Sequence, residues 1–157
     1  MKIGIDLGGS HIAIGVVDNK GKIVEKVQKR IMKAEKANIK KTIEEYIFEK
    51  VKLFISEYKI SEVGIAIPGT VKNGVVIKSV NLGLKNYKIS ERLQTKIDIP
   101  IKIRNDAKCA AIAENKYGTL KSFNRNVFLT LGTGIGGAVI IDNKLLDTGD
   151  LPGCEFG

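Results

Sequence analysis

The pattern of apolar residues over the first thirty positions predicts three short strands. Lys2–Leu7 and Ile12–Val17 are apolar runs, and Ile23–Arg30 alternates apolar and polar residues like a half-buried strand. Turn residues separate the runs, with Gly8-Gly9 after the first and Asn19-Lys20-Gly21 after the second. We therefore expect an antiparallel three-stranded meander.

Helical and strand patterns follow the meander. From Ala34 to Tyr58, apolar residues recur three or four positions apart, which predicts one amphipathic helix. Further elements are expected in this order: strand Val63–Ile67, strand Gly74–Lys78, helix Ile89–Lys96, strand Ile101–Arg104, helix Ala107–Tyr117, and strands Val127–Leu131 and Ala138–Ile141. This order indicates an α/β fold with a mixed β-sheet and helices on both faces.

Length and composition favour one globular domain over residues 1–157, because 43% of the residues are hydrophobic. The apolar runs are far shorter than the ~20 residues that cross a bilayer, and Asp6 stands where a signal peptide would be apolar. We expect a cytoplasmic protein with no membrane partner. Leu151–Gly157 has the residues of a loop, so we also expect this chain to be one lobe of a longer protein.

The net charge of +9 raises the question of nucleic acid binding. The lysines are spread along the chain, and between Lys33 and Lys52 they alternate with glutamates, which is typical of a solvated helix face. The chain has no aromatic residues interleaved with the lysines and no known binding module. We therefore expect that nucleic acid is not a partner. The excess positive charge would suit an anionic small molecule such as ATP.

Metal-binding motifs of cysteine and histidine are not found. Cys109 and Cys154 lack the spacing of a zinc site, and the single histidine, His11, does not complete one with them. We expect free thiols and no metal cage within these residues.

The segment from Asp6 to Ser10 is the first candidate phosphate site. An acid at a strand end is followed by Gly8 and Gly9, which allow backbone N–H groups to approach an anion, and by the Ser10 hydroxyl. An ordinary hairpin turn explains the two glycines as well.

The glycine-rich segment 132–137 is a second candidate. It matches G-x-G-x-x-G, but the β-branched run Ala138–Ile141 follows it, so it is expected to join two strands rather than open a helix. A nicotinamide-binding domain is therefore disfavoured. The alternatives are a phosphate loop and a bulged hairpin.

Asn105 and Asp106 stand where a predicted strand meets a predicted helix. Either residue would serve as a helix N-cap. Alternatively, Asp106 accepts a proton from a substrate hydroxyl while the Asn105 amide orients the substrate. Glu155, flanked by glycines, indicates little by itself.

Five motifs in this order resemble the ROK family of sugar kinases, which includes bacterial glucokinases, fructokinases and N-acetylmannosamine kinases. They are Asp6-Leu7-Gly8-Gly9-Ser10, Pro68-Gly69, Asn105-Asp106-Ala107, Gly132 to Gly137, and Glu155-Phe156-Gly157. The resemblance implies an actin-like, ribonuclease-H-like ATPase fold with ATP and sugar bound between two lobes. This chain would then be the N-terminal lobe, without the C-terminal lobe.

The resemblance also assigns roles to single residues. Asp6 would lie near Mg²⁺, usually through water, and Asp106 would be the catalytic base. The residues implied to face the nucleotide phosphates are Gly8, Gly9, Ser10, Gly132, Thr133 and Gly134. The residues implied to contact the sugar are Gly69, Asn81, Asn105, Asp106 and Glu155.

The implied function is ATP-dependent phosphorylation of a hexose or amino-sugar hydroxyl, with structural zinc only beyond residue 157 and a homo-oligomer left open. We expect this chain alone to have little or no kinase activity. The alternative is a sugar-responsive ROK-type transcriptional regulator or a non-catalytic sugar-binding protein. We expect no helix-turn-helix ahead of Lys2, so the regulator would need to bind DNA through another part. Ser10 and His11 stand where the family commonly has Thr and Lys, and Asn81–Lys85 lacks its frequent Trp.

Overall fold

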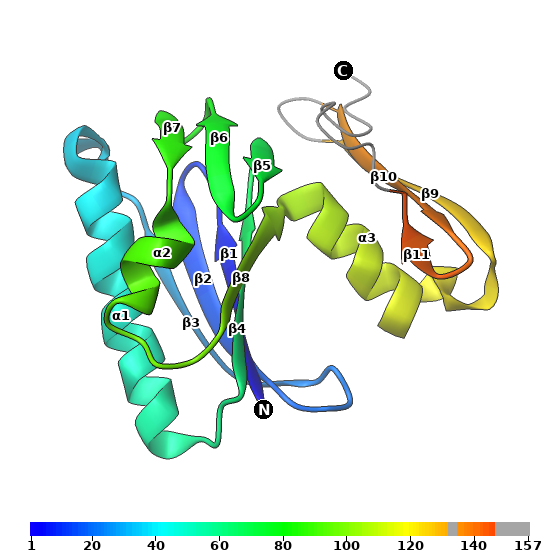
Figure 1. Ribbon diagram of the computed structural model, residues 1–157, viewed down its shortest axis with the longest axis horizontal. Coiled ribbons are helices and arrows are strands. Elements are labelled where there is room, and N and C mark those ends of the chain that lie inside the picture. Colours follow the sequence, from blue (N-terminus) through cyan, green and yellow to red (C-terminus); the bar gives the residue numbers. More distant parts are fainter. Residues whose placement is uncertain (132–134, 147–157) are drawn as a thin grey trace. The chain divides into compact units, whose positions relative to one another are not determined.

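The computed structural model describes residues 1–131 and 135–146. It divides into two compact units, Met1–Arg104 and Asn105–Gly157, each of which is described by itself. Figure 1 labels their helices and strands.

The first unit is built on a five-stranded sheet with the strand order β3-β2-β1-β4-β8. Its strands are β1 (Lys2–Leu7), β2 (His11–Val17), β3 (Ile23–Arg30), β4 (Glu62–Ile67) and β8 (Ile101–Asn105). β1 pairs antiparallel with β2 and parallel with β4, and β2 pairs antiparallel with β3. The predicted meander and the mixed character of the sheet are confirmed.

Alternation along the strands places the core on one face of this sheet. Helices α1 (Ile39–Glu57) and α2 (Ile89–Gln94) lie on that face (Figure 1). The side chains buried there from β1, β2, β4 and α1 are Ile3, Ile5, Leu7, Ile12, Ile14, Val16, Val63, Ile65, Ile67, Ile43, Ile47, Val51 and Phe54. Each contributes about 1.5–3 kcal/mol by burial, which holds the strand ends in place.

The helix predicted from Ala34 begins as a separate 3₁₀ turn, η1 (Lys33–Asn38), and α1 starts only at Ile39. The carboxylate of Glu35 explains the separate turn. It accepts hydrogen bonds from the Met32 N–H at 2.8 Å and from Lys29 Nζ at 2.6 Å, which ties η1 to the end of β3.

A small sheet, β5-β6-β7, completes the first unit. Its strands are β5 (Thr70–Lys72), β6 (Val75–Ser79) and β7 (Leu84–Tyr87). The apolar pattern predicted only β6, because the other two are short and Asn73 and Asn86, at positive φ, resemble turn residues. The buried Tyr87 hydroxyl donates to Glu44 on α1 at 2.7 Å, and burial raises the pKa of Tyr87 above its ordinary value.

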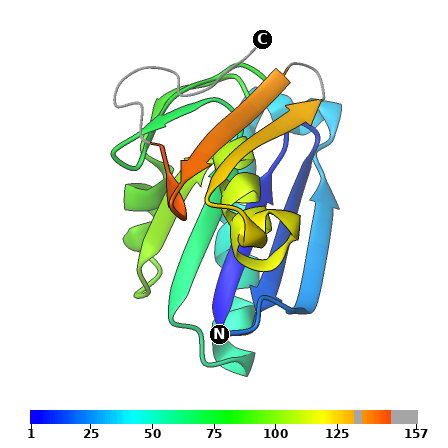
Figure 2. The ribbon, with the colours of Figure 1, turned by 90° about the vertical axis from the view of Figure 1, so that its right-hand side faces the viewer.

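The second unit combines α3 (Asp106–Tyr117) and the 3₁₀ turn η2 (Thr119–Ser122) with a three-stranded sheet (Figures 1 and 2). The strands are β9 (Arg125–Leu131), β10 (Ile135–Ile141) and β11 (Lys144–Leu145). β9 and β10 are antiparallel, with Leu131 opposite Ile135, which confirms that the glycine-rich segment joins a hairpin. Among the described residues, Ala111, Ala138 and Ile140 form a buried apolar cluster in this unit.

Among the described residues, no helix is long and apolar enough to cross a bilayer.

Glu62 on β4 provides a test of how the stability of the first unit depends on pH. Its carboxylate lies 2.6 Å from Lys102 Nζ and 2.8 Å from Lys2 Nζ. Hydrogen bonds from Lys102 and then Lys2 lower the pKa of Glu62 from 4.5 to about 2. Because the folded pKa is lowered, the ionised carboxylate stabilises the fold above pH 4.5, and this stabilisation is lost as the pH falls toward 2.

We expect Glu62→Gln to lower the free energy of unfolding by about 1 kcal/mol near neutral pH, a value reduced by solvent screening. The loss should shrink on acidification through the range between the two pKa values. Urea unfolding at several pH values measures it, with the exposed Glu57→Gln as the control. An equal loss at every pH would show that the ion pairs are not its source.

Candidate functional site

The turn between β1 and β2 offers hydrogen-bond donors at the end of the sheet. The Gly8 N–H donates to the His11 carbonyl at 2.9 Å and so belongs to the hairpin itself. The N–H groups of Gly9 and Ser10 and the Ser10 hydroxyl have no hydrogen-bond acceptor within the described part of the chain. Of the three residues of this turn that are expected to face phosphates, Gly9 and Ser10 therefore keep their donors available.

Asp6 and His11 flank this turn on the face of the five-stranded sheet opposite α1 and α2, which we call the open face. His11 Nε2 lies 3.2 Å from Asp6 Oδ2, and the two side chains are 38% and 56% exposed. A Cβ atom at Gly8 would come within 2.5 Å of His11 Cε1, so the imidazole ring lies against the bare backbone of Gly8. Glycine at this position makes room for the ring.

The turn expected to bind the nucleotide contacts Asn81, in the loop between β6 and β7 that is expected to bind the sugar. A Cβ atom at Gly9 would lie 3.2 Å from Asn81 Cβ and 3.5 Å from the Asn81 carbonyl oxygen. Neither residue is near the other in the sequence, and the fold of the first unit brings them into contact. Two motifs expected to serve different ligands thus meet at one edge of this unit.

Gly69 lies against the end of β6, the strand that precedes Asn81. Its φ is +101°, and a Cβ atom there would lie 2.2 Å from the Lys78 carbonyl oxygen and 2.9 Å from Ser79 Cα. Only glycine allows β6 to pass this close. Ser79 itself is 1% exposed, and its Oγ has no hydrogen-bond partner among the described residues.

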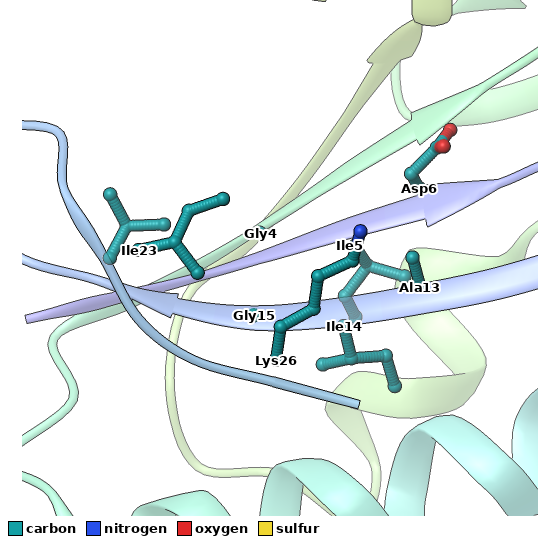
Figure 3. A pocket seen from close by; sticks show the side chains of 9 residues that line it. Gly4, Ile5, Asp6, Ala13, Ile14, Gly15, Ile23 and Lys26 are labelled. Atoms are coloured by element: carbon teal, nitrogen blue, oxygen red, sulfur yellow. The ribbon is translucent and has the colours of Figure 1, made fainter. Parts of the chain in front are cut away.

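The open face of the sheet carries a shallow hollow of about 300 Å³ (Figure 3). Its floor is low because Gly4 and Gly15 face each other across β1 and β2, and Ile23 and Lys26 of β3 flank it. The hollow reaches the predicted site only at Asp6. Gly8, Gly9 and Ser10 do not line it.

In the second unit, Asn105 and Asp106 form the start of α3. Asn105 Oδ1 accepts a hydrogen bond from the Lys108 N–H at 3.0 Å, so Asn105 is the N-cap that the simpler interpretation allowed. Asp106 Oδ1 accepts from the Ala107 N–H at 2.8 Å. Asp106 Oδ2 has no hydrogen-bond partner in the described ranges, and it can therefore accept a proton.

The glycine-rich hairpin packs against the start of α3. A Cβ atom at Gly136 would lie 2.7 Å from Thr130 Oγ1 and 3.3 Å from Ala107 Cβ, so the hairpin closes directly onto the residue after Asp106. Gly132, Thr133, Gly134 and Glu155 lie outside the described residues.

His11 and Ser79 are the residues of this region to which the sequence patterns assigned no role. His11 is the only histidine in the chain and directly follows the glycine turn, which was a signal for it. Ser79 carries no such signal, because its burial without a partner depends on how β6 packs. Within the described residues, no group of three or more His, Cys, Asp or Glu side chains is arranged to hold a metal ion.

Comparison with known proteins assigns the family. The model of the ROK family matches residues 2–151. The chain belongs to the ROK family. A glucokinase from Streptomyces coelicolor is 33% identical over 147 residues, which cover 92% of this chain and 45% of that protein. A xylose repressor from Caldicellulosiruptor bescii is 30% identical over 147 residues, 91% of this chain and 37% of the repressor.

The crystal structure of a ROK family glucokinase from Streptomyces griseus in complex with glucose and AMPPNP superposes with a TM-score of 0.86 and 30% identity, covering 99% of this chain and 49% of that one. This ROK chain therefore has the actin-like ATPase fold of the ROK sugar kinases. It spans about half the length of the glucokinases that it matches.

Proposed function

We propose that the protein transfers the γ-phosphoryl group of ATP to a hydroxyl of a hexose or amino sugar. The contact between Gly9 and Asn81 is the observation that carries this proposal. It joins the turn with free N–H donors to the loop expected to hold the sugar, as a transfer between two bound ligands requires. The similarity to glucokinases and to a glucokinase complexed with glucose and AMPPNP supports the same reaction.

On the nucleotide side, the N–H groups of Gly9 and Ser10 and the Ser10 hydroxyl would hold phosphate oxygens. Gly8 would contribute by leaving room, since its own N–H is used in the turn. Gly132, Thr133 and Gly134 are proposed as the second phosphate loop.

Mg²⁺ fits the donor set at Asp6. Mg²⁺ typically keeps several waters and binds one or two carboxylates together with substrate phosphates, and Asp6 is one half-exposed carboxylate beside the phosphate turn. Asp6 would hold the ion, usually through water. When bound, Mg²⁺ neutralises charge on the transferring phosphates.

On the sugar side, Gly69, Asn81, Asn105 and Glu155 are proposed to contact the sugar. The sugar hydroxyl oxygen attacks the γ-phosphorus, the bond to the β-phosphate oxygen breaks, and ADP leaves. Asp106 accepts the hydroxyl proton on Oδ2, while Oδ1 keeps its hydrogen bond from the Ala107 N–H. Since phosphoryl transfer depends mainly on positioning and charge, one proton acceptor is enough.

A sugar-responsive regulator is the second candidate, supported by the similarity to the xylose repressor. A regulator needs sugar binding but no proton acceptor or phosphate site. The combination of Asp106 with the Gly9–Ser10 donors therefore favours the kinase. We place this kinase in the cytoplasm, where ATP is available.

The test is a sugar panel applied to the full-length protein. We expect a hexose or amino sugar to raise the melting temperature, and the same sugar to release ADP from Mg·ATP at a rate in the usual range of about 1–10³ s⁻¹. Sugars that differ at one hydroxyl then identify the acceptor oxygen. A sugar that stabilises the protein while no sugar releases ADP would favour the regulator.

A further inference from the structure

His11 has no part in the reaction described above, yet its ring lies against the phosphate turn at Gly8. It is the first residue of β2 and lies on the same face of the sheet as Asp6, whose direct cross-strand neighbour is Ala13. Its ring contacts both the Asp6 carboxylate, at 3.2 Å, and the backbone of Gly8.

We propose that His11 is a positioning residue for the nucleotide site. Its Nε2–H donates to Asp6 Oδ2 and holds the carboxylate in one orientation, while its ring closes the side of the turn over Gly8. A metal–phosphate group would then meet Asp6 Oδ1 together with the donors of Gly9 and Ser10. This inference rests on the proposed function, because it concerns the nucleotide that the kinase uses.

The hydrogen bond matters because it is the one polar contact of the Asp6 side chain within the described residues. The carboxylate is 56% exposed, and His11 is its hydrogen-bond partner among the described residues. Fixing one oxygen directs the other, and removing such an outer partner from a metal-binding carboxylate typically costs about 10–100-fold in metal affinity. Without the hydrogen bond, the carboxylate would have to be ordered when the nucleotide binds.

The ring contact adds a second constraint on the same turn. The His11 carbonyl accepts from the Gly8 N–H at 2.9 Å, so the backbone and the side chain of one residue hold Gly8 from two sides. This leaves the Gly9 and Ser10 donors as the accessible part of the turn. An aromatic ring in place of His11 would keep the contact with Gly8 and lose only the hydrogen bond.

Three variants of the full-length protein separate the two contributions. His11→Phe keeps the ring without a donor, His11→Gln keeps a donor without the ring, and His11→Ala removes both. Calorimetric titration with Mg·AMPPNP should show a loss of about 10-fold or more in affinity for the Phe and Ala variants, and a smaller loss for Gln. Sugar affinity and melting temperature should stay close to those of the unchanged protein.

His11 also provides a signal that does not depend on activity. In a histidine-selective ¹⁵N spectrum of the full-length protein, the resonances of His11 are those that disappear in His11→Phe, so their changes report on this turn. We expect Mg·AMPPNP to shift the Nε2 resonance, sugar alone to leave it unchanged, and Asp6→Asn to shift it in the free protein. These three responses together are what a purely structural histidine would not show.

The inference is wrong if His11→Phe binds Mg·AMPPNP as tightly as the unchanged protein, or if Mg·AMPPNP does not change the chemical shift of Nε2. Failure of the proposed function looks different. If Mg·AMPPNP binding depends on His11 as expected but no sugar releases ADP, the kinase proposal fails and His11 remains a residue of the nucleotide site. If the unchanged protein does not bind Mg·AMPPNP, both fall.

Discussion

Asp106→Asn in the full-length enzyme should lower kcat by a factor of about 10² or more while sugar affinity changes only a few-fold. The substitution is well suited to this site. Asn retains an Oδ1 acceptor for the Ala107 N–H, so the start of α3 is preserved, and only the oxygen proposed to take the proton is replaced by an amide. The substitution should therefore slow the chemical step and leave sugar binding nearly unchanged.

Steady-state kinetics with the best sugar measure this effect, and Asp98→Asn is the matched control. Asp98 is an exposed acid in the segment between α2 and β8, outside the proposed site, and its neutralisation should leave kcat unchanged. An unchanged kcat in Asp106→Asn would remove Asp106 from the mechanism. A large loss of sugar affinity at constant kcat would instead make it a binding residue.

Gly69→Ala should have the largest effect on stability among single-methyl changes in the first unit. The new Cβ would lie 2.2 Å from the Lys78 carbonyl oxygen, at a φ of +101° that Ala rarely adopts. The backbone strain and the clash each cost about 1–3 kcal/mol, so we expect a loss of about 3 kcal/mol and a melting temperature lower by about 6–12 °C. Sugar affinity should fall as well if this loop contacts the sugar.

Gly74→Ala is the control for this experiment. Gly74 also has a positive φ, +77°, but the nearest atom to a Cβ there is Ser90 Oγ at 3.3 Å, the end of a side chain. It should cost only about 1 kcal/mol, the part due to the backbone conformation. Equal losses in the two variants would show that β6 shifts to accommodate the methyl group at Gly69.

Most of the larger elements could be predicted from the sequence because their burial follows a simple period. β1, β2 and β3 bury or half-bury alternate residues, and α1 buries Ile43 and Ile47 along one stripe. The short strands β5, β7 and β11 could not be predicted in this way. They contain too few residues for a period, and their pairing with a neighbouring strand is what makes them strands.

The candidate site, like the fold, could be predicted from the sequence only in part. The acids and glycines could be selected as candidate site residues because their order matches the ROK family, although each motif taken alone also allowed a structural role, such as a hairpin turn or a helix cap. The sequence likewise indicated that the segment after Leu131 joins a hairpin, because a β-branched run follows it.

Only the tertiary structure decided which atoms of these motifs are available. The sequence does not tell which backbone N–H groups of Gly8, Gly9 and Ser10 are available to a ligand. In the structure, the hairpin hydrogen bond uses the Gly8 N–H and leaves those of the other two residues available. The contacts of Gly9 with Asn81 and of His11 with Asp6 also depend on packing. A residue type and its neighbours determine the turn that a chain can make, whereas hydrogen-bond partners and close contacts between distant segments exist only once the sheet has brought those segments together.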